Sequence, residues 1–286
     1  MNKELLEQIK KTVVFIGGFK SILKPDGTTE QEVSLCGTGF IVQLENVFFL
    51  ITAKHVIAEI DQNTKKVIKE RDGLYVFNNL KEDVPGGAVV KASSLDENKK
   101  KYPFFYHQDD SIDLVLMPFP IDINEDDIKT MSRDMFVEHN DVCETYDVFF
   151  VSYQPGISEI KLDSRVAPII RKGSIARINK NNSVYIDGAA FPGNSGSPVF
   201  IMPSPIRYTS AGISFGVDAI GGKYLGTISE YKQYSEVAIS QQTGRPRIVF
   251  EENTGLSMLW TSKQVLEIIE SEKVKTFIRN NQISRK

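Results

Sequence analysis

The chain has 286 residues, of which 41% are hydrophobic and 25% are charged, as in an ordinary globular protein. Its net charge of −3 and isoelectric point near 5.8 offer no basic field to a nucleic acid. No apolar run approaches the ~20 residues that a membrane-spanning helix needs. We therefore expect neither a nucleic-acid-binding protein nor a membrane protein.

The N-terminal segment, residues 1–11, is charged and amphipathic, which predicts a short helix and lacks the apolar core of a secretion signal. The two cysteines, Cys36 and Cys143, are far apart, and without an export signal we expect reduced thiols and a cytoplasmic location. These cysteines and three dispersed histidines provide none of the short spacings of zinc sites. We expect no metal ion and no cofactor.

Short segments rich in Val, Ile, Phe and Tyr follow one another along the chain and predict β-strands. A first group comprises residues 12–17, 39–44, 47–52, 73–77, 88–92 and 112–119. A polar, acidic stretch at 121–140 separates it from a second group, residues 147–153, 157–162, 174–179, 184–186, 199–202, 210–215, 224–230, 247–251 and 256–260. The regular spacing favours antiparallel barrels or sandwiches over βαβ units.

The only strong helical pattern lies at the C-terminus. Thr261 and Ser262 can cap a run of apolar residues at helical spacing that begins at Val265. We therefore expect three parts: residues 1–125 with a short helix and a first β-barrel, residues 126–260 with a linker and a second barrel, and a C-terminal helix at 261–286.

Residues 193–198, Gly-Asn-Ser-Gly-Ser-Pro, form a turn ahead of the apolar run 199–202. Glycine at 193 allows backbone angles that let neighbouring N–H groups converge beside Ser195, as in an oxyanion hole. The same composition is also typical of a plain loop. By themselves, these six residues leave both interpretations open.

His55 follows the predicted strand 47–52, where an imidazole can serve as a general base near neutral pH. The alternative is a surface histidine in a turn. Asp113 lies at the edge of an apolar strand, where a carboxylate needs hydrogen bonds and a histidine N–H can provide one. Its alternative is a turn former at the strand end, for which Asp109 and Asp110 are equally suitable.

The joint occurrence of these residues in matching contexts is more specific. Cys36–Phe40, Thr52–Val56, Ile112–Leu116 and Asp187–Gly196 resemble, in order, the motifs of the trypsin-like serine peptidases, and within them the bacterial HtrA/Deg-like branch. Further similarity lies in Arg171–Ile175 and Gly255–Ser262, so that nearly the whole chain is covered. The resemblance implies an all-β fold of two antiparallel six-stranded β-barrels with a C-terminal α-helix.

The resemblance also assigns roles. Ser195 attacks the substrate carbonyl, His55 takes and returns the proton, and Asp113 orients His55 and stabilises its charged form. The loop Gly193-Asn194-Ser195 forms the oxyanion hole, with the N–H groups of Gly193 and Ser195 as donors. We interpret Ser197 as a turn residue.

Two positions depart from the pattern of the digestive enzymes. Asn194 replaces an aspartate that pairs with a new amino terminus, so we expect no zymogen activation even though Ile16–Gly18 superficially matches an activated terminus. Ala189 replaces an acidic residue in the specificity pocket, which favours a small or medium apolar residue at P1 (the substrate residue before the cleaved bond). The substrate-binding set predicted from these motifs is Ala189, Gly226, Thr227, Ile228, Ser229 and Ser257.

The sequence thus predicts a serine endopeptidase that acts on peptide or protein substrates through an acyl-enzyme. The alternative is a catalytically silent peptide-binding or scaffold module of the same fold. An α/β-hydrolase esterase is excluded, because its motif needs glycine at 197 and its histidine last in the chain. Because the HtrA branch usually carries a PDZ domain and this chain ends at Lys286, we expect a stand-alone peptidase. A regulatory protein partner or an oligomer remains open.

Overall fold

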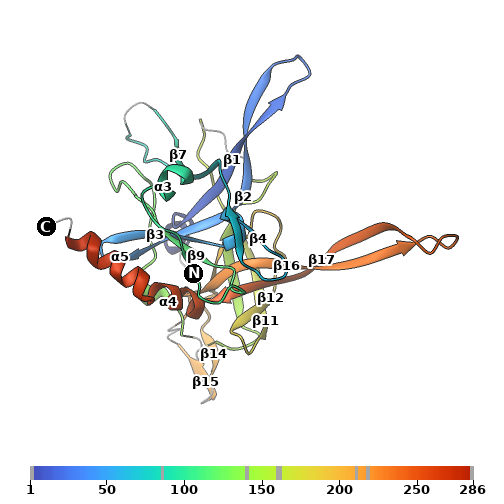
Figure 1. The fold of residues 1–286 in the computed structure, drawn as a ribbon. Helices are drawn as coiled ribbons and strands as arrows, with labels where there is room; N and C mark the ends of the chain where they lie inside the picture. Colours follow the sequence, from blue (N-terminus) through green and yellow to red (C-terminus); the bar gives the residue numbers. More distant parts are fainter. Residues whose placement is uncertain are drawn as a thin grey trace.

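The computed structural model describes residues 3–84, 87–138, 142–158, 163–209, 212–216 and 220–283. Its α-helices are α1 (Lys3–Lys10), α2 (Lys54–Ile57), α3 (Leu95–Lys99), α4 (Ser262–Ile269) and α5 (Glu272–Ile283). The predicted N-terminal helix is confirmed as α1. The predicted C-terminal helix is divided between α4 and α5 (Figure 1). Within these described ranges, none of the helices has the length and apolar character to cross a bilayer.

The N-terminal half is built on one antiparallel sheet with strand order β7-β6-β1-β2-β3-β9-β8. Its strands are β1 (Val13–Leu23), β2 (Thr29–Leu44), β3 (Val47–Thr52), β6 (Leu74–Asn79), β7 (Val90–Ser94), β8 (Phe105–Tyr106) and β9 (Val115–Pro118). A separate hairpin joins β4 (Ala58–Ile60) to β5 (Val67–Glu70). The sheet has seven strands and its hydrogen bonding ends at β7 and β8, whereas six strands in a closed barrel were expected.

The C-terminal half is a closed barrel of six antiparallel strands in the order β10-β11-β12-β17-β16-β13, as predicted. The strands are β10 (Asp147–Ser152), β11 (Ile169–Ile178), β12 (Ser183–Asp187), β13 (Pro198–Ile201), β16 (Tyr224–Ile239) and β17 (Pro246–Thr261). A small hairpin outside the barrel pairs β14 (Ile206–Thr209) with β15 (Gly212–Phe215).

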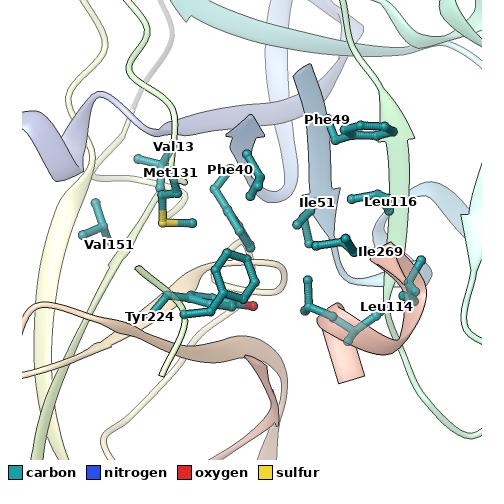
Figure 2. Close-up of a cluster of buried hydrophobic side chains, with 14 of the residues drawn as sticks. Val13, Phe40, Phe49, Ile51, Leu114, Leu116, Met131, Val151, Tyr224 and Ile269 are labelled. Atoms are coloured by element: carbon teal, nitrogen blue, oxygen red, sulfur yellow. The ribbon is translucent and has the colours of Figure 1, made fainter. Parts of the chain in front are cut away.

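A shared apolar core fixes the two halves against each other. Phe40 of β2 and Tyr224 of β16 are both buried, and their ring centroids lie 5.2 Å apart (Figure 2). The same cluster contains Ile269 of α4 and Val274 of α5, so the C-terminal helices cover its outer side. Burial of apolar surface stabilises such a core by about 25 cal/mol per Å². The geometry at the boundary therefore rests on packing as well as on hydrogen bonds.

Several segments differ from the sequence prediction. Strands β1 and β2 extend into a long projecting hairpin, and so do β16 and β17 (Figure 1). Strand β17 is one continuous strand where two separate strands, at 247–251 and 256–260, were expected. The prediction of a strand at 157–162 is wrong for Ile157 and Ser158, which lie in a turn. Residues 159–162 fall outside the described ranges. Thr261 is the N-cap residue of α4, but its hydroxyl donates to Gln264 instead of capping the backbone.

Candidate active site

His55 lies on α2, which begins two residues after β3 ends. The preceding Lys54 is buried, and its ammonium donates to the carbonyl oxygens of Lys65 at 2.9 Å and Asp110 at 2.7 Å. Burial lowers the pKa of Lys54, and the nearby charge of Asp113 opposes this shift. Lys54 thus ties the loops around 65 and 110 to the helix that carries His55.

Asp113 and His55 form a doubly hydrogen-bonded pair. The pairing of Thr52 in β3 with Val115 in β9 brings the two residues together across the sheet. Asp113 accepts the His55 backbone N–H on Oδ1 at 2.9 Å, and its Oδ2 lies 2.6 Å from His55 Nδ1. Burial acts to lower the pKa of His55, but the charge and hydrogen bond of Asp113 outweigh it, so that the pKa is raised above 6.5.

The nucleophile turn occupies Phe191–Asn194, just before Ser195. The Asn194 N–H donates to the Phe191 carbonyl at 2.9 Å, with Pro192 second and Gly193 third in the turn. Gly193 has φ of +90°, the value that a type II turn requires at that position. A Cβ there would also lie 2.3 Å from Cδ2 of Leu35, so that a larger residue would have to displace this side chain.

Asn194 is fully buried and ties this turn to the barrel. Its side-chain amide donates to Ser152 Oγ at 3.1 Å and to the Tyr153 carbonyl at 2.9 Å, while its Oδ1 accepts the Phe191 N–H at 2.8 Å. These uncharged hydrogen bonds of Asn194 support the turn from within the barrel.

The hydrogen bonds around Asn194 bear on the expected oxyanion loop, for which the N–H groups of Gly193 and Ser195 were predicted as donors. Both the backbone N–H and the side-chain amide of Asn194 have partners in this structure, so Asn194 shapes the loop. The N–H groups of Gly193 and Ser195 donate to no other group in the part of the chain that the structure describes. These two N–H groups are therefore the donors available to a substrate oxygen.

Thr38 of β2 joins the N-terminal sheet to the nucleophile turn. Its hydroxyl donates to the Gly193 carbonyl at 2.9 Å and accepts the Tyr153 N–H at 3.0 Å, and its N–H donates to the Ser195 carbonyl at 2.8 Å. The approach is so close that a Cβ on Gly196 would lie 2.0 Å from the Thr38 carbonyl oxygen. The sequence marked Thr38 as part of a motif, but not this contact.

Ser229 links Asp113, the predicted acid, to Ser195, the predicted nucleophile. The register of β16 against β17 shifts between Ile228 and Glu230, which leaves Ser229 out of the ladder. Its carbonyl accepts the Ser195 hydroxyl at 3.3 Å, and its own hydroxyl donates to Asp113 Oδ2 at 2.6 Å. Within the described contacts, Ser195 makes no hydrogen bond to His55.

The predicted substrate-binding residues are distributed between surface and interior. Ala189 is partly exposed, but Ser257 is buried, donates to the Gly188 carbonyl at 2.6 Å and accepts the Ala190 N–H at 3.0 Å. The Ser257 hydroxyl therefore fixes the loop that carries Ala189. Its contact with a substrate stays a prediction, and in this structure its hydroxyl is engaged by the loop.

The predicted edge strand lies mostly in the interior. Gly226, Thr227 and Ile228 are buried in β16, and their contact with a substrate stays a prediction. The Thr227 hydroxyl lies 2.5 Å from the Tyr224 hydroxyl, and Ile228 exchanges backbone hydrogen bonds with Gly196 and Ser197. These residues hold the nucleophile loop, and the accessible part of β16 begins after Ser229.

The remaining candidates from the sequence have other surroundings. His107 lies 2.8 Å from Glu267 in a surface pair, and His139 falls outside the described residues. The Ser197 hydroxyl is buried and has no hydrogen-bond partner among the described residues. Asp109 accepts the Ser111 N–H in a loop turn, as expected of a turn former.

A family model matches the part of the chain that carries His55, Asp113 and Ser195. Residues 37–201, more than half of the chain, match the family model of the trypsin-like peptidase domain. A structural search finds the serine endoprotease from Yersinia pestis, with 12% sequence identity and a TM-score of 0.47. The match covers 93% of this chain and 64% of that one. No curated protein matches by sequence. On the extent of the family match, the chain belongs to the trypsin-like peptidase family.

Proposed function

We propose that this chain is a serine endopeptidase in which residues 1–125 supply the base and its acid and residues 126–260 supply the nucleophile. The observation that carries the proposal is the connection through Ser229. Its hydroxyl donates to Asp113 at 2.6 Å and its carbonyl accepts the Ser195 hydroxyl at 3.3 Å, so that acid and nucleophile share one residue. The His55–Asp113 pair at 2.6 Å completes the set.

In the first step, the Ser195 hydroxyl leaves Ser229, donates to Nε2 of His55 and attacks the substrate carbonyl carbon. The hydroxyl proton passes to His55, and Asp113 at Nδ1 stabilises the imidazolium. The carbonyl oxygen becomes an oxyanion and accepts the N–H groups of Gly193 and Ser195. Two preorganised donors of this kind often supply the greatest part of the rate enhancement in acyl transfer.

In the second step, the carbon–nitrogen bond breaks and the His55 proton moves to the leaving amine, which leaves an ester of Ser195. Water then attacks the ester, gives its proton to His55 and forms a second oxyanion. Collapse of that oxyanion releases the carboxylic acid and returns the proton from His55 to Ser195. Bonds and protons balance over the cycle, with water as the only added reactant.

We further propose a small or medium apolar P1 preference. Support comes from Ala189, which brings no charge to the pocket, and from Ser257, whose hydroxyl is already satisfied by Gly188 and Ala190. Apolar pockets discriminate by size only modestly, by roughly 10- to 200-fold per methylene. Cleavage-site profiling with a peptide library tests this point, and a preference for Arg or Lys at P1 would contradict it.

A fluorophosphonate probe tests the main proposal. We expect covalent labelling of the wild-type protein and none of the Ser195→Ala variant. Ser197→Ala is a matched control, because it removes a neighbouring hydroxyl that has no partner among the described residues. Peptide binding that survives in Ser195→Ala, with no labelling or turnover of the wild type, would instead support the silent binding module.

A further inference from the structure

Strands β16 and β17 continue beyond the barrel as a two-stranded ribbon, residues 232–255. Its ladder runs from Gln233 opposite Asn253 to Ile239 opposite Pro246. In Figure 1 the ribbon is the long orange hairpin that projects away from the barrel. It begins next to Ser229, which places its base at the candidate active site.

The ribbon exposes large apolar side chains on both faces. Six of them are between 45% and 62% exposed: Tyr234, Val237, Ile239, Ile248, Val249 and Phe250. Because successive strand residues point to opposite faces, the Val237–Val249 pair lies on one face and Ile248 and Phe250 lie on the other. A lone two-stranded hairpin is marginally stable in water, and an exposed apolar patch of this kind marks an interaction surface.

The ribbon has no net charge that would attract a charged partner. It contains three basic residues, Lys232, Arg245 and Arg247, and three acidic ones, Glu236, Glu251 and Glu252, which cancel. A strongly charged partner would find no complementary field on this surface. The composition therefore favours an apolar partner.

The free edge of β16 is continuous with the nucleophile loop. One edge of β16 pairs with β17 along its length, whereas on the other edge β13 covers only Tyr224–Thr227. Ile228 then bonds Gly196 and Ser197. From Glu230 to Ile239 no strand from the described ranges pairs with this second edge. A free strand edge is a template for an extended peptide.

The position of the proposed P1 pocket indicates the direction in which a substrate chain would run along β16. Ala189 lies on the loop that Ser257 fixes, and Ser257 pairs with Tyr231 in β16. Because His55 of the N-terminal half protonates the leaving amine in the proposed mechanism, the residues after the cleaved bond lie on the side of His55. The residues before it are left on the barrel side, where a P1 side chain at Ala189 lets them continue past Tyr231. At about 3.3 Å per residue, the edge to Ile239 accommodates roughly eight of them.

We propose that the ribbon is an outer substrate site, which binds an extended apolar stretch of the substrate on the N-terminal side of the cleaved bond. This inference rests on the proposed function. The substrate adds as a strand to the free edge of β16, so its apolar side chains stand beside those of β16 itself. These are Val237 on one face and Tyr234, three residues away and 56% exposed, on the other.

Two groups of reporter peptides test this proposal. A short peptide carries four residues before the reporter amide, and extended versions add eight residues, either alternating apolar or Ser/Asn only. For the wild type we expect kcat/KM to be about tenfold higher with the apolar extension than with the polar one. Equal values for the two extensions would overturn the proposal.

The ribbon variant Tyr234→Ser/Val237→Ser removes one apolar side chain of β16 from each face. We expect it to lose the preference for the apolar extension but to hydrolyse the short peptide like the wild type. The matched control Leu23→Ser/Ile68→Ser changes residues that are 73% and 66% exposed elsewhere, and should keep the preference. A ribbon variant that keeps the preference, or a control that loses it, would overturn the proposal.

Two further measurements separate the remaining outcomes. In a Ser195→Ala background, fluorescence anisotropy compares affinity for the extended apolar peptide with and without the ribbon substitutions. This result stands even if the protein hydrolyses nothing. A loss of affinity with the ribbon substitutions supports the site, and an unchanged affinity overturns it. Sedimentation that shows a wild-type dimer, broken by the ribbon variant while the peptide preference remains, would assign the ribbon to a second copy of this chain instead.

Discussion

The two halves of the candidate site are built in different ways. In the N-terminal half, His55 and Asp113 are fixed by direct hydrogen bonds of 2.6 and 2.9 Å. In the C-terminal half, a glycine turn and the buried Asn194 fix the backbone around Ser195, while its hydroxyl is bonded only to the Ser229 carbonyl in the described structure. The proposed base, His55, is thus held by side-chain contacts, and the proposed oxyanion loop is held through its backbone.

This difference makes the residues that connect the two halves important, because each half depends on the other through them. Among the described residues, the hydrogen bonds that cross the boundary at the site join Thr38 to Gly193, Tyr153 and Ser195. Another joins Ser229 to Asp113. Changes within one half should therefore affect either proton transfer or the oxyanion loop. Changes in the crossing residues should affect both.

The largest expected effect comes from the nucleophile. Ser195→Ala should lower kcat by roughly 10⁴- to 10⁶-fold, as the loss of a triad residue does in peptidases. The measurement is peptide hydrolysis under saturating substrate. Ser197→Ala should stay near the wild type, because its hydroxyl has no hydrogen bond to lose among the described residues.

The next effect concerns the acid. Asp113→Asn keeps the size of the side chain but removes the charge that stabilises protonated His55, so we expect kcat to fall by about 10⁴-fold. The pKa of His55 should also fall, because the charge of Asp113 raises it in the wild type. NMR titration of His55 checks the pKa, and an unshifted value would contradict this account of the pair.

The pH dependence tests the N-terminal half alone. The base must be neutral, and the pKa of His55 is raised above 6.5 because Asp113 outweighs the effect of burial. We expect kcat/KM to fall as the pH drops through this raised pKa, with a single-proton slope. The same shift stabilises the fold below pH 6.5, and this contribution is lost as the pH rises through the folded-state pKa. An activity plateau that extends well below pH 6 would contradict the assignment of His55.

The smallest of these effects is expected for Thr38, whose hydrogen bonds join the two halves. Thr38→Val removes the hydroxyl that bonds the Gly193 carbonyl and the Tyr153 N–H, both in the interior. We expect the free energy of unfolding to fall by about 1–3 kcal/mol and the rate of probe labelling to fall with it. Chemical denaturation and labelling kinetics measure the two effects. Thr130→Val removes a surface bond to Gln43 and serves as the control.

The sequence predicted those parts of the molecule that local patterns determine. The strand expected at 47–52 is β3 with the same bounds, because its apolar run ends at polar residues on both sides. The hairpins β1–β2 and β16–β17 were underestimated, because polar and apolar residues mix on both of their faces and give no strand period. The break between α4 and α5 was also missed, since Glu270 and Ser271 interrupt no apolar spacing.

Within the candidate site, motifs located the residues but not their contacts. The contact between Thr38 and Gly193 joins positions 155 residues apart, and no local pattern encodes it. The same holds for Ser229, which reaches Asp113 because of a β-bulge that the sequence does not reveal. We predicted Gly226, Thr227 and Ile228 as part of a substrate-binding edge because they resemble the family motif for that edge. In the structure these residues are buried in the barrel.

The central claim is that a base from the N-terminal half activates a serine from the C-terminal half. Mass spectrometric mapping of the fluorophosphonate adduct, in the wild type and in His55→Ala, tests this claim most directly. We predict a single adduct on Ser195 whose rate of formation falls at least about 10³-fold in His55→Ala. An adduct on Ser197, or labelling of Ser195 at the wild-type rate without His55, would contradict it.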